Sequence, residues 1–502
     1  MMRAGMDRLC GFLAVRRIWA LPGVIASALI AGGCDGTGDF LPGHSRPVFE
    51  HDWPDPKELA LGMNEFTPPD PGEAIFEASS GVRAYIVPES SDPLVRITAA
   101  LPLGRLYEAE EEVGAATLLT RLLTTRGAAG AGPPLSLRLA ELGTTLSTVE
   151  SLDATQISLD VIPEDWRKGL ELLVELLRDP DLDASAIRQY RSGTGYDMPM
   201  AGIGGEGFRP KVELERRVSG YPLAPPDSGT AVSLAAIRGL ASRSLRPDRV
   251  VLGIGGAVSR DAVEELIESV TRGWTGSEES LVPPRVIESD GSPSRFYTVD
   301  VPSLEGWIAI GRVGGAVPES DQAALSALRF ILAERLNIAA REMRGLANRD
   351  DFQVPETGSG SGLLHIRTGG RPEAVAPLIR FSLDEVERIY DPSEPVTDAE
   401  VRRVQGWMLG AVWQRSLESA TSASGTFALE RLRRGSTDRL IEWPEAVKSV
   451  TAPDIKAIAQ RYLDPTTLVT VVVGPLDRIR EARHPRWPMA LDELEASLSG
   501  SR

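Results

Sequence analysis

Histidine and cysteine are the side chains that most often hold a metal ion or serve as a nucleophile, and this chain of 502 residues has few of them. Its four histidines are His44, His51, His365 and His484, and its two cysteines are Cys10 and Cys34. No two histidines stand four residues apart, so no helix can direct two imidazoles to one zinc ion from successive turns. The chain also lacks a G-x-S-x-G nucleophile elbow and a phosphate-binding P-loop.

Three smaller candidates have ordinary structural explanations. His44 and His51 lie in a stretch rich in Gly, Pro and Asp, which a solvated linker explains better than a metal site does. Gly253–Gly256 follows a β-run as a dinucleotide-binding loop would, but Val258 stands where that motif has its last glycine. His365 lies on a predicted strand, on the same face as Leu363 and Arg367, and we expect a structural role for it rather than catalysis.

The stretch Glu111–Gly127 predicts a buried helix. Its leucines at 118, 119, 122 and 123 share one side of a 3.6-residue repeat, and a glycine ends it. The rest of the chain predicts a duplication. Residues 243–256 and 461–474 share Arg, Leu, Pro, a β-run and a final Gly at the same spacing, an offset of 461 − 243 = 218. Upstream, a strand and helix at 363–386 repeat the pattern at 155–177. A period this long indicates a duplicated domain rather than a solenoid.

Composition and charge narrow the function further. The length suits two or three folded units, and the 42% hydrophobic and 25% charged residues are ordinary for a globular protein. The formal net charge of -17 argues against nucleic acid as a partner, because non-specific binding to phosphates needs a basic surface.

The N-terminus predicts export. Arg16 and Arg17 precede an apolar run at 18–30 that is shorter than the roughly 20 residues of a membrane span. Small residues at 31–33 then lead into Cys34, an arrangement that resembles the bacterial lipobox, in which the cysteine is lipidated. We therefore expect a cell-envelope lipoprotein, anchored through Cys34 to the inner or outer membrane and facing the periplasm. The alternative is an ordinary signal peptide that contains this cysteine.

The predicted helix and the duplication together resemble the M16 (insulinase/pitrilysin-like) metallopeptidases. In that family the helix carries the zinc motif H-x-x-E-H; here Thr117, Thr120 and Arg121 stand at the first His, the Glu and the second His. The family's later glutamate is also missing, and only Asp197 is a nearby carboxylate. Neither threonine nor arginine replaces imidazole as a zinc ligand, and threonine is no general base at neutral pH. The resemblance thus implies no catalytic residue, no metal and no cofactor.

A second element of the family lies in the C-terminal half. The segment Arg341–Asn348 resembles the R-x6-Y element, whose arginine and tyrosine bind the substrate backbone from the second domain. Arg341 matches that arginine, and Asn348 replaces the tyrosine. The resemblance implies that both residues bind peptide. The alternative is that Arg341 is a surface or salt-bridged residue of an amphipathic helix.

The resemblance implies an α+β fold of two homologous domains, each a mostly antiparallel sheet packed with helices, that together form a half-shell. The predicted segments are a signal peptide at 1–33, a flexible tether at 34–70, an N-terminal domain at 71–274, a linker at 275–294, a C-terminal domain at 295–478 and a tail at 479–502.

The expected function is that of a non-catalytic subunit. It would pair with a zinc-bearing M16-like subunit, or form a homodimer, and help to bind a peptide substrate, with only its lipid anchor touching the membrane. Two alternatives stay open. One is an enzyme with a displaced metal site, and the other is an envelope scaffold that uses the fold as a module.

Overall fold

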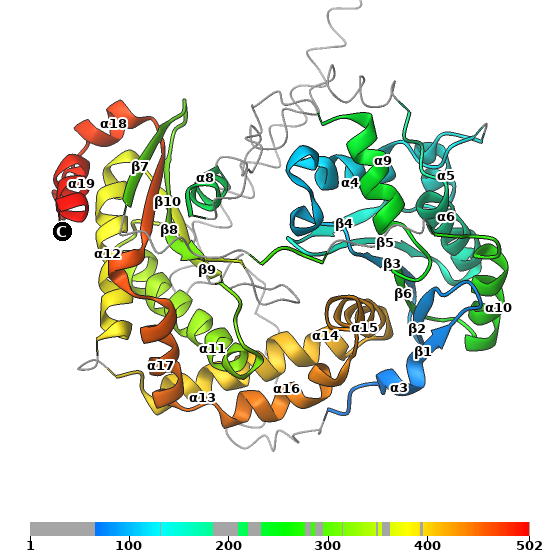
Figure 1. Ribbon diagram of the computed structural model, residues 1–502. Helices are drawn as coiled ribbons and strands as arrows, with labels where there is room; N and C mark the ends of the chain where they lie inside the picture. Colours follow the sequence, from blue (N-terminus) through cyan, green and yellow to red (C-terminus); the bar gives the residue numbers. More distant parts are fainter. Residues whose placement is uncertain are drawn as a thin grey trace, which may run out of the picture. The chain divides into compact units, whose positions relative to one another are not determined.

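The computed structural model describes residues 66–130, 132–183, 209–218, 232–276, 283–286, 295–313, 315–347, 350–353, 362–391 and 395–500 (Figure 1). The signal peptide, most of the predicted tether and both cysteines lie outside these residues. Residues Phe66–Arg502 form one compact unit, to which the following description applies. No helix in the described ranges is both long enough and apolar enough to span a membrane.

The first sheet has six strands, all antiparallel to their neighbours except for the parallel pair β2 and β6. In spatial order they are β1 (Ile75–Glu77), β2 (Arg83–Pro88), β6 (Val251–Gly256), β3 (Val95–Leu101), β5 (Thr155–Val161) and β4 (Ser147–Glu150). β5 alternates buried and half-buried residues, as its sequence predicts for a strand with one face on the core.

The second sheet repeats this order without the extra edge strand. Its strands are β7 (Arg295–Asp300), β11 (Val469–Gly474), β8 (Gly306–Val313), β10 (Leu363–Gly370) and β9 (Asp350–Gln353), and again only the first pair, β7 and β11, is parallel. β6 and β11 begin 469 − 251 = 218 residues apart and both end on a glycine with positive φ. The shared topology confirms the predicted duplication.

Each half of the chain contributes its own set of helices, most of which cover one face of its own sheet. In the first half they are α3 (Pro71–Ala74), α4 (Ala115–Thr125), α5 (Leu135–Glu141), α6 (Trp166–Arg178), α8 (Arg209–Val218), α9 (Leu234–Ser244) and α10 (Arg260–Val270). In the second half they are α11 (Glu319–Leu336), α12 (Val375–Tyr390), α13 (Asp398–Trp407), α14 (Arg415–Leu417), α15 (Ala420–Arg434), α16 (Asp438–Ser449), α17 (Ala452–Tyr462), α18 (Leu476–Glu481) and α19 (Leu491–Gly500). One apolar core joins α4, α6, α9 and α10 to the first sheet, and another joins α11, α12 and α17 to the second.

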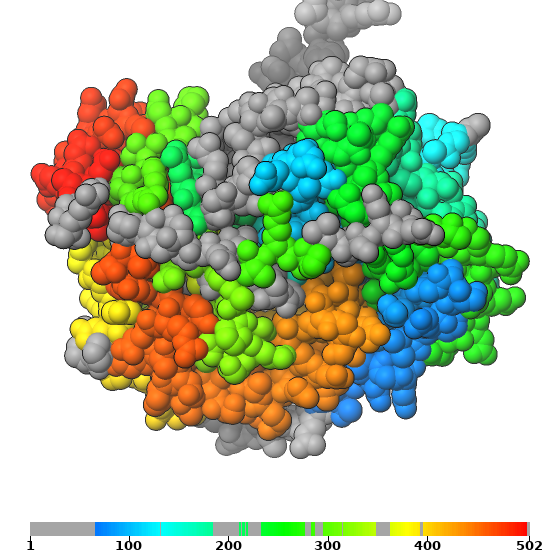
Figure 2. Space-filling view, viewed as in Figure 1, coloured from blue at the N-terminus to red at the C-terminus, as the bar shows by residue number. Residues whose placement is uncertain are grey.

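The opposite face of each sheet is covered by a helix from the other half (Figure 1). α15 packs on β2, β3 and β6, where the ring centroids of Tyr85 and Phe427 are 5.6 Å apart. In return, Leu214 and Val218 of α8 join an apolar cluster with β8 and β11. Figure 2 shows the orange surface of the α15 region beside the blue surface of the first strands. The two homologous halves are thus tied together by an exchange of helices.

Two glycines of β6 allow α15 to lie directly on the strand. A Cβ atom at Gly253 would collide with the carbonyl oxygen of Ser424, and one at Gly255 would collide with that of Ala420. Glycine is the residue that permits such close backbone approach. Helix packing therefore explains these glycines, whose sequence alone resembled part of a dinucleotide-binding loop.

We predict that Gly255→Ala lowers the free energy of unfolding by about 1–3 kcal/mol or more, because the added methyl group pushes against backbone that has no room to move. The matched control is Gly406→Ala in α13, where a Cβ meets nothing within 4 Å and φ is not positive. That control should be neutral or slightly stabilising. Thermal and urea unfolding would measure both, and equal melting temperatures for the two variants would contradict the packing account.

Candidate functional site

α4 forms where the sequence predicts a buried helix, although it is shorter than the predicted span. It begins after Gly114, whose φ of 92° suits glycine, and ends at Thr125. The leucines at 118, 119, 122 and 123 are all buried in the first core, as their spacing indicates. The helix frame of the family motif is therefore intact in this chain.

The three motif positions hold side chains that do not fit zinc. Thr120 is 1% exposed, and its hydroxyl donates a hydrogen bond to the carbonyl oxygen of Ala116 at 3.0 Å. Thr117 and Arg121 are half-buried on the same helix. A zinc site needs imidazole, thiolate or carboxylate ligands, and the cationic guanidinium of Arg121 would repel the ion. In the described part of the chain no cluster of His, Cys, Asp and Glu has the makeup of a metal site.

A cavity of about 120 Å³ adjoins Thr117. Arg105 and Lys211 contribute to its wall, as do Glu150 at the end of β4 and Thr155 at the start of β5. Desolvation raises the pKa of Glu150, while the positive charges of Arg121 and Arg105 act in the opposite direction. This position thus offers cationic side chains and one carboxylate, a combination that suits polar contacts with protein and not a divalent cation.

Glu108 binds the start of α4, a role that the sequence did not predict. It is 1% exposed, and its carboxylate accepts hydrogen bonds from the backbone N–H groups of Gly114 (3.1 Å) and Ala116 (2.8 Å) at the start of α4. Burial raises the pKa of Glu108 to about 7, although the two N–H donors and Arg105 lower it. A carboxylate at a helix N-terminus is a known capping arrangement, but Glu108 lies six residues before Gly114, outside the usual spacing.

Arg341 lies at the surface. It belongs to a π-helical segment, Asn337–Glu342, that continues α11, and 53% of its side chain is exposed. Its Nε is 3.6 Å from a carboxylate oxygen of Glu342, and the carbonyl of Arg341 accepts a hydrogen bond from Gly345, whose φ is +61°. Arg341 is not among the residues that line the cavity beside Thr117. Asn348 lies outside the described residues, so its predicted role stays a prediction.

His365 on β10 is a buried, neutral imidazole. It is 2% exposed, and burial, reinforced by the charges of Lys211 and Arg367, lowers its pKa to about 3. The side chain faces the sheet surface that α8 covers, because Leu363 two residues earlier belongs to that apolar cluster. These surroundings fit the structural role that its position in the strand predicts.

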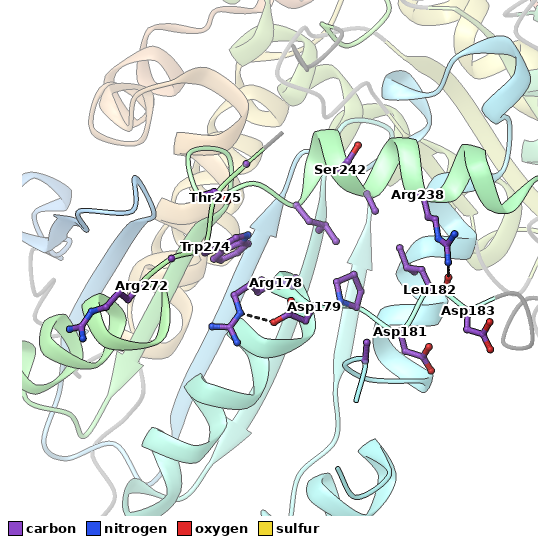
Figure 3. A pocket seen from close by; sticks show the side chains of 17 residues that line it. Arg178, Asp179, Asp181, Leu182, Asp183, Arg238, Ser242, Arg272, Trp274 and Thr275 are labelled. Carbon is purple, nitrogen blue, oxygen red and sulfur yellow. Dashed lines mark hydrogen bonds and ion pairs between the residues drawn. The ribbon is translucent and has the colours of Figure 1, made fainter. Parts of the chain in front are cut away.

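A larger cavity, of about 770 Å³, lies against the end of α6, α9 and the segment after α10 (Figure 3). Two of its arginines already have partners within the protein. Arg178 bonds to Asp179 at 2.7 Å, and Arg238 donates to the carbonyl of Leu182 at 2.9 Å. No residue of the α4 motif lines this cavity, and its described lining brings no nucleophile beside a base.

Comparison with known proteins identifies related sequences. Residues 231–406 match a family model described as Peptidase M16 inactive domain. Cytochrome b-c1 complex subunit 1, mitochondrial, of Caenorhabditis elegans is 22% identical over 444 residues, which cover 83% of this chain and 91% of that protein. The human protein of the same name is 20% identical, covering 78% of this chain and 84% of that protein.

Solved structures share the fold. A peptidase M16 inactive domain from Pseudomonas fluorescens aligns with a TM-score of 0.66 and 18% identity, over 82% of this chain and 98% of that one. A protease from Helicobacter pylori aligns with 0.68 and 19%, over 80% and 99%. The periplasmic protease PqqL from Escherichia coli aligns with 0.61 and 16%, over 90% of this chain but only 50% of that one. These likenesses confirm the predicted α+β fold of two homologous domains.

We predict that Glu108 makes the protein less stable as the pH rises. The pKa of Glu108 is about 7 in the folded protein and near 4.5 in the unfolded chain, so the folded state holds the proton more tightly. The contribution to stability is complete below about pH 4.5 and is lost as the pH rises to about 7, an effect on the order of 3 kcal/mol. Melting curves from pH 4.5 to 8 would measure it.

Glu108→Gln should remove this part of the pH dependence, because the amide does not ionise. Glu111→Gln, an exposed substitution of the same kind, is the matched control and should keep the wild-type profile. If Glu108→Gln and wild type show parallel profiles, the assignment to Glu108 is wrong.

Proposed function

We propose that this chain, which belongs to the M16 peptidase family, is a non-catalytic M16-like subunit that binds extended peptide and works with a second subunit. The observation that carries the proposal is the state of α4. The helix keeps its burial, its glycine start and its packing against α9, yet the motif positions hold Thr117, Thr120 and Arg121. The fold of a peptidase persists where the chemistry of zinc hydrolysis has no ligands and no base.

The edge of the first sheet supports a role in peptide binding. All four residues of β4 (Ser147–Glu150) are exposed, and β4 pairs with β5 as the last strand of the described sheet. An extended peptide can add to such an edge through main-chain hydrogen bonds, with side-chain contacts giving selectivity. The exposed Val149, at 65%, offers an apolar contact on this edge. Glu150 also lines the cavity beside Thr117, so the strand edge adjoins the position of the altered motif.

Similarity to named subunits supports a partner. The chain is similar, over most of its length, to proteins named as subunit 1 of the cytochrome b-c1 complex, which are parts of a larger assembly. The preferred partner is a zinc-bearing M16-like subunit in a heterodimer, and a second copy of this chain is the other possibility. In this arrangement Arg341 and Asn348 would contact the peptide from the second domain.

The location we propose is the cell envelope. The apolar run at 18–30 supports export, and Cys34 would carry the lipid that holds the protein at the membrane. The similar E. coli protein is a periplasmic protease, which agrees with this compartment. A scaffold role is the second candidate, because proteins named as subunits of the cytochrome b-c1 complex are similar over most of this chain.

Peptide binding can be tested with the purified chain. A fluorescent peptide of neutral charge and extended sequence should bind and stay intact. Val149→Lys should weaken its binding about tenfold, a loss of about 1.4 kcal/mol, because it removes an apolar contact and a lysine on an edge strand opposes strand addition. Leu304→Lys, at a residue that is 81% exposed outside β4, is the matched control and should bind normally. Cleavage by the chain alone, or equal binding by all three proteins, would contradict the proposal.

The role of Arg341 can be tested in a reconstituted pair with a zinc-bearing M16-like subunit. Arg341→Ala should lower the partner's kcat/KM for peptide by tenfold to a hundredfold, as expected for losing a charge-assisted bond of about 1.5–3 kcal/mol. Melting temperature and co-purification should not change, because the side chain is 53% exposed. Arg371→Ala, at an arginine whose side chain is 78% exposed, is the matched control. If cleavage is unchanged with Arg341→Ala, Arg341 does not contribute to peptide binding and the chain supports its partner only structurally.

A further inference from the structure

A third cavity lies within the helices of the C-terminal half. It measures about 400 Å³ and is formed by α11, α15, α16 and a π-helical segment, Met408–Gln414, that continues α13. Apolar and aromatic side chains make up much of its wall, namely Leu325, Phe330, Met408, Trp413, Leu440 and Trp443. The volume is within the range of small-molecule sites, and π-helical segments are often found at functional positions.

The aromatic wall is held in place by a local feature of the sequence. Pro444 lies inside α16 and has no N–H, so it cannot bond to the carbonyl of Leu440 one turn earlier. The indole Nε1 of Trp413 donates to that carbonyl at 2.8 Å instead. The position of Trp413 in the cavity wall is thus fixed by a hydrogen bond that the proline makes available.

Four arginines line the same cavity, and they are Arg329, Arg433, Arg434 and Arg439. Glu430 is the only carboxylate among the lining residues that the structure describes. Its Oε1 is 2.7 Å from Nε of Arg434 and 3.8 Å from Nη1 of Arg439, so two guanidinium groups share one carboxylate oxygen. Each guanidinium has five N–H donors, more than this single contact uses.

Arg434 and Arg439 share the single charge of Glu430. Arg433 is paired outside the cavity with Asp153, which follows β4, at 3.1 Å. Arg434 also donates to the neutral amide oxygen of Gln322 at 3.1 Å. Burial lowers the pKa of Arg439, and the charges of Arg434 and Arg433 lower it further while those of Glu430 and Glu319 oppose this. An anion entering the cavity would relieve that repulsion.

Arg439 is oriented for such a ligand. Its Cζ lies 4.4 Å from the centroid of the Trp443 ring, a cation–π contact that holds the guanidinium against the apolar wall. Side-chain exposures of 16% for Arg433, 17% for Arg434 and 25% for Arg439 show that the cations are largely shielded from solvent. Shielded guanidinium groups bind carboxylates more strongly than exposed ones do.

We propose that this cavity is a binding site for a small carboxylate with an apolar, preferably aromatic, body, which competes with Glu430 for the guanidinium groups of Arg434 and Arg439. The aromatic wall would hold the body of the ligand, and the arginines would bind its head. Either a free acid or the C-terminal residue of a peptide has this chemistry. The inference does not depend on the loss of the zinc motif.

The test uses the full chain and two probes of the same shape, N-acetyl-tryptophan and its uncharged amide. Calorimetry at low salt should show the acid binding at least tenfold more tightly than the amide, with the difference shrinking as salt is added. A peptide that ends in tryptophan with a free carboxylate should bind as well as the acid if peptide termini are the source. Weaker binding of that peptide would identify the free acid as the source.

Two variants should shift the affinity in opposite directions. Arg439→Gln should weaken binding of the acid at least tenfold, and Glu430→Gln should tighten it because the internal competitor is gone. Arg402→Gln, at an exposed arginine of α13 that does not line the cavity, is the matched control. Melting curves would show which variants fold. If Glu430→Gln does not fold, Arg439→Gln measured with the two probes decides the question. Equal affinity for acid and amide, or no effect of Arg439→Gln, would overturn the proposal.

Discussion

The close contact between α15 and β6 is the constraint on which the rest of the structure depends. Gly253 and Gly255 leave the space in which the helix backbone around Ala420 and Ser424 lies on the strand. Gln156 of β5 donates to the carbonyl of Gly425 at 3.0 Å, and Arg433 at the end of α15 bonds to Asp153. Because α8 makes the reciprocal contact with the second sheet, neither half, as far as the structure describes it, covers both faces of its own sheet. Stability and the placement of β4 therefore depend on both halves.

This arrangement explains how the chain keeps a peptidase fold without the chemistry. The residues that hold α4 in place are its buried leucines and Glu108, and none of them is a zinc ligand in the resemblance. The helix does not need the side chains at 117 and 121 for packing. The third position, Thr120, is small, and its hydroxyl donates a hydrogen bond to the carbonyl of Ala116 in the same helix. Fold and catalysis are separable in this way because they rest on different residues of one helix.

Much of the fold follows from the sequence because its signals are local. The leucine spacing in Glu111–Gly127, the alternation at 155–161 and the repeat offset of 218 each describe neighbouring residues, and the structure places a helix, a strand and equivalent strands there. The helix exchange has no local signal, because Gly255 and Ala420 are far apart in the chain and each looks ordinary alone.

The candidate site shows the same limit. The spacing of residues in the sequence was enough to identify the motif positions. Glu108 and the arginines around Glu430, in contrast, come together only through tertiary contacts. The π-helical segment that contains Arg341 is likewise not indicated by the types of its residues.

The central claim is that this M16-like chain has no zinc chemistry of its own. The most direct test is the metal content of the purified full chain after incubation with excess zinc and removal of unbound ions, measured by elemental mass spectrometry. The account predicts that no stoichiometric zinc remains, because Thr117, Thr120 and Arg121 offer no ligand set. Retention of one zinc per chain, released only by a chelator, would contradict it.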